Sequence, residues 1–208
     1  MESIVSQFLE GLSQSTWLEY LAVFSGILSV WFSRREHILV YPTGLVNTVI
    51  YVYLSLKAHL PGEASVNLYY TVVSVYGWYV WSRRDSFRRP VLRITFSDGR
   101  QRLLQLGFFL LCYGILFLSL RLLKAEFAPG AIPWADALAS ASAYTGMWLM
   151  ARKKVESWVW WIVTNVSSIP LYFVKGYVVT SLYYLVLLGL AVSGFLEWRR
   201  RAKDGRHE

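Results

Sequence analysis

The sequence of 208 residues has few charged side chains and a single cysteine. Asp, Glu, Lys and Arg make up 16% of the chain, whereas soluble domains carry roughly 25%, so the polar surface that a water-soluble globule needs is missing. Cys112 has no second cysteine with which to form a disulfide within the chain. The absence of a Walker A motif excludes ATP hydrolysis by that route.

Apolar and aromatic residues are abundant instead, at 55% and 17% of the chain. A helix needs about 20 mostly apolar residues to cross the hydrocarbon core of a bilayer. Seven stretches approach that length, and the sequence therefore predicts an all-α polytopic protein with seven transmembrane helices. The predicted spans are residues 18–33, 38–56, 66–82, 103–120, 134–151, 157–174 and 178–197.

The basic residues indicate the orientation of these spans. If the N-terminus is outside, 17 of the 21 Lys and Arg residues fall in the cytoplasmic segments 34–37, 83–102, 152–156 and 199–208. Because positively charged loops stay on the cytoplasmic side, we expect the N-terminus outside and the C-terminus in the cytoplasm. The net charge of +8 is explained by these loops, so nucleic acid is not expected as a partner.

The chain also resembles itself at an offset of 117 to 118 residues. Asn47 matches Asn165, and Tyr70 matches Tyr184 after a shorter loop; Gly-x-x-x-Trp closes both copies. Four spans separate matching members, an even number, so the two copies enter the membrane in the same direction. The predicted architecture is three plus one plus three spans, a parallel repeat in the arrangement of SWEET-like transporters.

This repeat divides the chain into segments. An amphipathic N-terminal helix is expected because apolar residues of the leader share one helical face; a disordered leader is the alternative. The leader contains no Lys or Arg, unlike a signal peptide. The segments are the N-terminal helix (1–17), repeat 1 (18–82), an Arg-rich cytoplasmic loop (83–102), a linker helix with an outer loop (103–133), repeat 2 (134–198) and a basic tail (199–208).

Ionisable residues are missing from the middle of every predicted span. An ion-coupled pump normally needs such a relay, so facilitated diffusion is favoured over energised transport. His37, His59 and His207 all fall in loops, so the spans hold no metal site and no catalytic triad. We therefore expect no enzyme activity, no catalytic residues and no cofactor.

Amides and aromatic rings are the candidate ligand-binding groups within the spans. Asn47 and Asn165 lie near mid-span, where each amide either binds a polar ligand or holds two helices together. Trp158, Trp161 and Asn165 share one helical face, and Asn67 and Tyr70 lie three apart. Such a face suits a flat aromatic ligand, particularly a cation. An interfacial aromatic belt is the alternative, assigned to four further residues: Trp17, Trp81, Trp134 and Trp198.

These residues carry a family resemblance. The stretch Trp134-Ala135-Asp136-Ala137, the run Trp148 to Lys154 and the pattern Trp158-x-x-Trp161-x-x-x-Asn165 resemble the PnuC family of nicotinamide riboside transporters. Ile169-Pro170-Leu171-Tyr172-x-x-Lys175-Gly176 and Tyr76-Gly77-Trp78-Tyr79-x-Trp81 are similar too. The resemblance covers spans two, three and five to seven, and is weak in the N-terminal helix and the fourth span.

The resemblance implies passive uptake of a vitamin-type nucleoside through a bacterial inner-membrane homotrimer, with a cytoplasmic kinase that traps the substrate for NAD salvage. The site it implies consists of Trp158, Trp161, Asn165, Asn67 and Tyr70, to which Asn47, Tyr184 and Trp148 are added. One departure is Met147, where the family often has Gln before the tryptophan. Thiamine, or another vitamin carried by close relatives, is therefore an alternative substrate, and a non-transporting sensor or scaffold is a second alternative.

Overall fold

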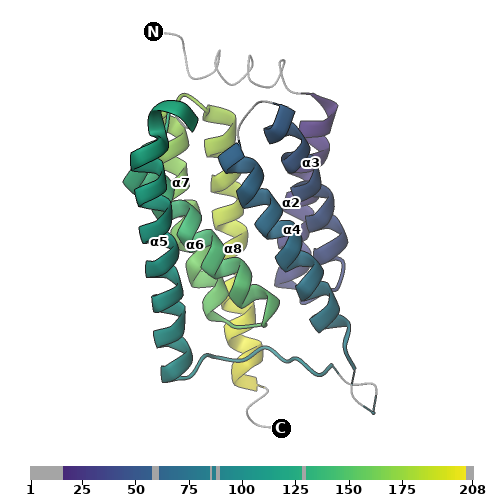
Figure 1. Cartoon of the computed structure of the whole chain (residues 1–208). Helices are drawn as coiled ribbons and strands as arrows, with labels where there is room; N and C mark the ends of the chain where they lie inside the picture. The colour runs from purple at the N-terminus through teal and green to yellow at the C-terminus, as the bar shows by residue number, and fades with distance from the viewer. Residues whose placement is uncertain (1–15, 58–60, 85, 88–89, 128–129, 205–208) are drawn as a thin grey trace.

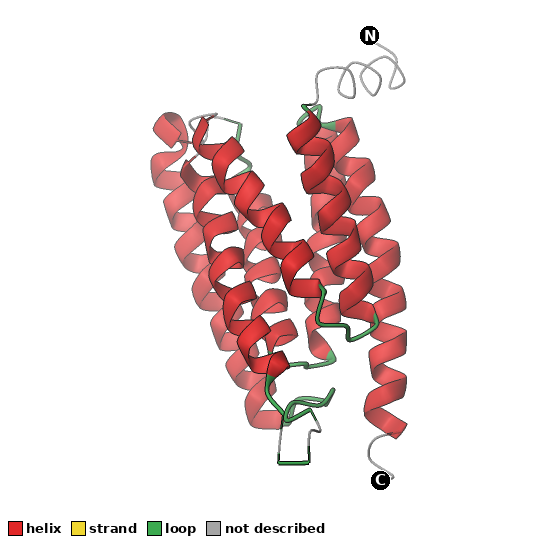
Figure 2. Cartoon of the chain, turned by 90° about the vertical axis from the view of Figure 1, so that its right-hand side faces the viewer, coloured by secondary structure: helices red, strands yellow, loops and turns green. Residues whose placement is uncertain are grey.

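The computed structural model describes residues 16–57, 61–84, 86–87, 90–127 and 130–204. Within these ranges the chain forms seven α-helices and no strand longer than an isolated bridge (Figure 2). The predicted amphipathic helix (1–17) lies outside the described residues, apart from its last two. The helices are α2 (Trp17–Arg34), α3 (Val40–Lys57), α4 (Pro61–Ser82), α5 (Gly99–Phe127), α6 (Pro133–Ala151), α7 (Glu156–Val174) and α8 (Val178–Asp204).

Each predicted span corresponds to one helix, but three helices run beyond the predicted boundaries. α4 begins at Pro61 rather than 66, α5 begins at Gly99 within the predicted Arg-rich loop, and α8 continues to Asp204 into the predicted tail. The start of α5 has a local cause, because the Asp98 carboxylate accepts from the Gln101 backbone N–H at 2.7 Å and caps the helix. Hydropathy locates the membrane core, whereas backbone hydrogen bonds continue past it into the polar interface.

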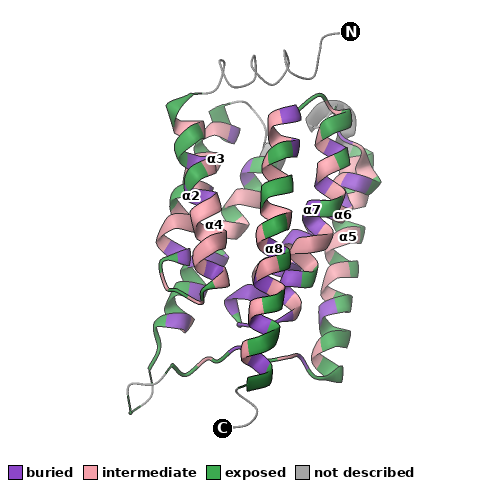
Figure 3. Ribbon diagram, turned by 180° about the vertical axis from the view of Figure 1, so that it is seen from behind, coloured by how far each residue is buried: buried purple, intermediate pink, exposed green. Residues whose placement is uncertain are grey.

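The helices form two groups of three. α2, α3 and α4 pack together, and so do α6, α7 and α8; α2 meets α8 and α4 meets α6 where the groups join (Figure 1). α5 packs against α6 and presents most of its surface outward (Figure 3). The helices α2, α4, α6 and α8 all end at one end of the bundle, here called the basic end because the Arg-rich segments lie there.

Two helices pass a strict length and hydropathy test for crossing a membrane among the described residues, over Gly99–Leu122 and Val178–Asp204. The other five contain more small polar residues, many of which are buried where helices touch, among them Ser25, Thr48, Ser142, Thr145 and Ser157. Small and hydroxyl side chains are typical of close helix contacts in membranes. They lower the average hydropathy of a helix without exposing polar groups to lipid.

Paired aromatic contacts recur at a spacing of 117 residues. Tyr41 and Trp81 meet edge-on, with ring centroids 5.2 Å apart and an interplanar angle of 87°. Trp158 and Trp198 occupy the positions 117 residues later and meet at 5.6 Å and 88°. The two groups of helices therefore contain the same buried aromatic arrangement.

A glycine makes room for each of these pairs. A Cβ atom on Gly77 would lie 2.5 Å from the Tyr41 ring, and one on Gly194 would lie 2.6 Å from the Trp158 ring. Both approaches are shorter than van der Waals contact permits, so only glycine allows the aromatic ring to lie against the helix backbone. The two glycines are again 117 residues apart.

Trp81 and Trp198 are buried rather than interfacial, so their assignment to an aromatic belt was wrong. The Trp81 indole N–H donates to the Ala151 carbonyl at 3.1 Å, and the Trp198 indole N–H donates to the Arg34 carbonyl at 3.2 Å. Each tryptophan reaches from its own group of helices into the other group. Tertiary contacts across the two groups therefore account for their burial.

The amide pairing expected from the sequence is off by one residue. Asn47 donates to the Ala22 carbonyl at 2.7 Å, and the equivalent contact is made by the Thr164 hydroxyl, which donates to the Ala139 carbonyl at 3.4 Å. Thr164, not Asn165, therefore occupies the position that matches Asn47. The constant spacing of 117 residues also matches Tyr184 with Asn67 rather than with Tyr70.

Candidate substrate site

An aromatic group lies where α4 meets α6 and α7. The Tyr70 ring centroid is 6.3 Å from that of Trp161 and 6.2 Å from that of Tyr144. Tyr69 lies 4.5 Å from Tyr144 and donates its hydroxyl to the Tyr144 carbonyl at 3.0 Å. The structure therefore brings together two predicted site residues, Tyr70 and Trp161, and adds two tyrosines that sequence reasoning missed.

The indole of Trp161 lies against a glycine of α6. A Cβ atom on Gly146 would lie 3.3 Å from the Trp161 indole, so the indole lies directly against the α6 backbone. The side chain is half-buried, which leaves part of the ring uncovered. An indole held in this way offers a rigid face to a flat ligand.

A second aromatic group lies between α7 and α8. Tyr184 stacks on Tyr172 with ring centroids 5.2 Å apart and an interplanar angle of 15°. The Tyr184 ring also lies 5.8 Å from that of Tyr183, at an interplanar angle of 62°. The predicted residues Tyr70 and Trp161 thus lie in the first aromatic group, and Tyr184 lies in the second.

Asn165 lies one helical turn beyond Trp161 on α7. The residue is 3% exposed, and its side-chain carbonyl oxygen Oδ1 is buried without a hydrogen-bond partner. A buried acceptor that lacks a partner costs about 1–3 kcal/mol. Proteins tolerate such a cost at sites where a ligand supplies the missing donor. Asn165 therefore suits recognition of an N–H or O–H group.

Trp158 has no accessible face in this structure. It is 1% exposed, its ring lies against Gly194, and it meets Trp198 edge-on. Its equivalent in the first half, Tyr41, packs against Gly77 and Trp81 in the same way. Trp158 shares the predicted helical face with Trp161, but its ring is in contact with Gly194 and Trp198, and its indole Nε1 is buried without a hydrogen-bond partner.

The two remaining predicted amides are engaged with the backbone. The Asn47 amide nitrogen donates to the Ala22 carbonyl and lies so close to Gly26 that a Cβ there would approach it to 2.8 Å. Asn47 thus holds α3 against α2, the packing alternative considered for it. Asn67 is half-buried and donates to the Glu63 carbonyl of its own helix at 3.0 Å.

Trp148 lies apart from the central aromatic groups. Its ring stacks on Tyr76 with an interplanar angle of 14°, and the Arg152 guanidinium covers it at 4.0 Å. Trp31, which precedes it by 117 residues, carries Arg35 at the same distance. Both are indole–guanidinium pairs close to the basic end, and the structure does not bring Trp148 together with Asn165 or Tyr184.

An ion pair joins the two groups of helices at the basic end. The Lys153 ammonium is bonded to the Glu36 carboxylate at 2.5 Å and lies 4.6 Å above the Trp81 ring. Lys153 is 4% exposed. Glu36 and Lys153 both have positive φ angles, 59° and 52°, and are 117 residues apart. The sequence analysis gave these loops only a role in orienting the protein in the membrane. Glu36, the single acidic residue of the basic segment 34–37, was the feature that could have indicated the ion pair.

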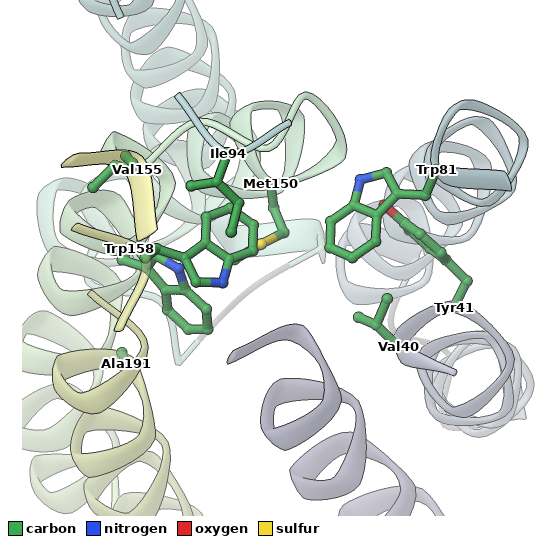
Figure 4. Packing of buried hydrophobic residues seen from close by; sticks show 10 residues of the cluster. Val40, Tyr41, Trp81, Ile94, Met150, Val155, Trp158 and Ala191 are labelled. Carbon is green, nitrogen blue, oxygen red and sulfur yellow. The ribbon is translucent and has the colours of Figure 1, made fainter. Parts of the chain in front are cut away.

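The segment that precedes α5 lies across the same end. The Thr95 backbone N–H donates to the Lys153 carbonyl, and the Val155 N–H donates to the Thr95 carbonyl, both at 3.1 Å. Ile94 packs in a buried cluster with Met150 and Trp158 (Figure 4). The basic end is therefore closed by the ion pair, by the buried tryptophans and by this segment.

An apolar hollow lies elsewhere in the described structure. It has a volume of about 660 Å³ and lies against α6 and α7, between residues such as Leu138, Ile162 and Val166. Its lining suits lipid chains rather than a polar vitamin. Among the described residues, no group of three or more His, Cys, Asp or Glu side chains is placed to hold a metal ion.

The comparisons with known proteins place this arrangement in a family. The family described as nicotinamide mononucleotide transporter matches residues 16–200. The chain belongs to this family. The match covers α2 to α7 completely and α8 up to residue 200, including α2, outside the resemblance seen in the sequence, and α5, where that resemblance was weak.

Two curated proteins with similar sequences are transporters. The chain is 25% identical to the nicotinamide riboside transporter PnuC of Escherichia coli (strain K12), over 91% of this chain and 87% of the relative. It is 23% identical to the riboflavin/roseoflavin transporter RibM of Streptomyces davaonensis, over 90% of this chain and 86% of the relative. As a member of this family, the chain is a multi-pass protein of the inner membrane.

The fold is also that of a solved relative. The crystal structure of the vitamin B3 transporter PnuC superimposes with a TM-score of 0.74 at 24% sequence identity, over 99% of this chain and 89% of that chain. The resemblance to the PnuC family and the all-helical fold are thus confirmed.

Proposed function

We propose that this chain carries nicotinamide riboside across the bacterial inner membrane. The observation that carries the proposal is the contact of Tyr70 with Trp161, one helical turn from the unpartnered Asn165 oxygen. The nicotinamide ring of this substrate is flat, aromatic and positively charged, which suits attraction to electron-rich rings. Its carboxamide N–H₂ is a donor of the kind that the Asn165 oxygen lacks.

Transport in this proposal is facilitated diffusion. The ion pairs described on the helices lie near their ends, such as Lys175 with Asp136 and Lys153 with Glu36. A cytoplasmic kinase that phosphorylates the incoming nucleoside for NAD salvage would maintain the gradient. Dissipating the proton gradient across vesicles that contain the protein should leave uptake unchanged, whereas arrest of uptake would contradict the passive mechanism.

The architecture proposed for this function is the parallel three-plus-one-plus-three repeat, as a homotrimer. Contacts that recur at a spacing of 117 residues support the two equivalent halves, with α5 as the linker. The N-terminus is placed outside and the C-terminus in the cytoplasm, on the distribution of basic residues. The basic end is then the cytoplasmic end, and its closure must open for the substrate to enter the cell.

Thiamine is the alternative substrate, since it is also a cationic aromatic vitamin, and the similarity to RibM adds riboflavin to the comparison. Met147, which replaces an amide common in the family, is half-buried on α6 next to Gly146 and Trp148. A changed polar contact at this position would be the first place to look for altered specificity.

The proposal is tested by titrating the purified protein with nicotinamide riboside, thiamine and riboflavin while following tryptophan fluorescence. We expect saturable quenching by nicotinamide riboside, retained in Trp148→Phe and largely lost in Trp161→Phe. Trp148→Phe is the matched control, because it removes an indole outside the central region. Equal quenching of both variants would overturn the site, and saturable quenching by thiamine or riboflavin alone would overturn the choice of substrate.

A further inference from the structure

A small hollow lies between α2 and α8 near the basic end. It has a volume of about 350 Å³ and is lined by Arg34, Ser193, Leu196, Glu197 and Arg200. This α2–α8 hollow lies where one group of helices meets the other. It shares no residue with the aromatic groups.

The charges of the hollow are unbalanced. The Arg34 guanidinium donates to the Ser193 hydroxyl at 3.3 Å, and no acidic partner is recorded for it among the described residues. Arg200 and its neighbour Arg201 share the single Glu197 carboxylate, at 3.0 and 2.9 Å. Because Glu197 is already bonded to Arg200 and Arg201, the hollow keeps excess positive charge. The half-buried Arg34 carries most of it.

The hollow is bordered by an apolar surface that faces the membrane. Leu196 is 58% exposed, and Val192, one turn earlier on α8, is also exposed. The predicted spans end at residues 33 and 197, so Arg34 and Arg200 lie at the level of the lipid headgroups. A cationic hollow above an apolar helix face fits a molecule with an anionic head and a hydrocarbon tail.

The other half of the protein repeats the charges of this hollow only in part. Arg83 lies 117 positions before Arg200, but the residues 117 positions away from Arg34, Ser193 and Glu197 are Ala151, Tyr76 and Val80, which carry no charge. The positive charge of Arg34 is thus not required by the packing that the two halves share. A half-buried guanidinium without a carboxylate partner is costly unless it serves a ligand.

We propose that the α2–α8 hollow binds an anionic phospholipid of the leaflet at the basic end. The lipid phosphate accepts hydrogen bonds from the Arg34 and Arg200 guanidinium groups, whose planar forks match phosphate oxygens. An acyl chain lies along Val192 and Leu196 of α8. Because Arg34 belongs to the first group of helices and Arg200 to the second, the bound lipid stabilises the contact between them.

The proposal is tested on full-length protein that has been delipidated in a neutral detergent. Thermal unfolding is followed with added short-chain phosphatidylglycerol, with the phosphatidylcholine of the same chain length and with inorganic phosphate. We expect a saturable rise in melting temperature with phosphatidylglycerol only. In Arg34→Gln the apparent affinity should fall by about tenfold. Arg199→Gln, an exposed neighbour outside the hollow, should respond like the original protein.

An equal response of Arg34→Gln and Arg199→Gln would overturn the proposal. A full response to inorganic phosphate would show a site for free anions instead of a lipid. If Arg34→Gln does not fold, Arg34→Lys can be used instead, because it keeps the charge but lacks the planar guanidinium that binds two phosphate oxygens. Weakened binding is expected for this variant too. The measurement does not involve a vitamin, so its outcome is independent of the proposed transport function.

Discussion

The Glu36–Lys153 ion pair lends itself to a quantitative test of how the basic end is held closed. Removing one partner of a buried ion pair costs roughly 3–5 kcal/mol, because the other charge is left buried and uncompensated. Glu36 is 23% exposed, so water screens part of this penalty, and we expect about 2 kcal/mol for Glu36→Gln. The Lys153 ammonium would keep the Trp81 ring and a neutral amide oxygen as partners, but it would lose its counter-charge.

Removing the lysine should cost less. In Lys153→Met the thioether still packs on the Trp81 ring, and Glu36 keeps Arg201 as a partner at 3.5 Å, so we expect about 1 kcal/mol. The double variant leaves no buried charge and should also cost about 1 kcal/mol, which makes the coupling between the two positions about 2 kcal/mol. Lys203→Gln, an exposed lysine on the same end, is the control.

The assay has two readouts. Unfolding in detergent gives the double-mutant cycle, and alkylation of an introduced cysteine gives access from the basic end. Met150→Cys, placed in a Cys112→Ala background, reports on a buried side chain of the closure. Glu36→Gln should speed its alkylation, and adding Lys153→Met should slow it again. Additive stabilities, with a coupling below about 0.5 kcal/mol, would refute the reasoning, and so would alkylation rates that do not change.

Two further predictions concern packing and the site. Gly194→Ala places a Cβ 2.6 Å from the Trp158 ring and should destabilise the protein by about 1–3 kcal/mol, whereas Gly189→Ala, with open space around it, should be neutral or slightly stabilising in thermal unfolding. Equal melting temperatures for the two variants would contradict the close packing of Trp158. Asn165→Leu should abolish nicotinamide riboside uptake into liposomes with little loss of stability, while Asn47→Leu should lower the melting temperature by breaking the bond to Ala22. Loss of uptake in Asn47→Leu at an unchanged melting temperature would reverse the roles assigned to the two amides.

The helices were predictable from the sequence because hydropathy and capping act locally. Each stretch of apolar residues long enough to span a bilayer became one helix, and the Asp98 cap explains why α5 begins earlier than hydropathy predicted. The family resemblance was carried by short motifs on α4, α6, α7 and α8 and was confirmed over residues 16–200.

The site was predictable only in part. Residue type and helical spacing selected Trp161, Tyr70 and Asn165, and the structure places Tyr70 beside Trp161 and Asn165 one turn from it. The internal repeat added Tyr184, which lies in the second aromatic group, and the family resemblance added Trp148, which lies outside both. Spacing along one helix specifies a face, but not which neighbouring helix covers that face.

Tertiary structure decided which residues of the same type are buried and which of them have hydrogen-bond partners. Trp81 and Trp198 sit at the ends of predicted spans, where a belt position was reasonable, yet each is buried because its N–H reaches a carbonyl of the other half. Asn47 and Asn165 look equivalent in sequence, but one amide has a backbone partner and the other has an unpartnered oxygen. Local pattern determines helix and depth in the membrane, whereas burial and hydrogen-bond partners depend on which segments far apart in the chain come together.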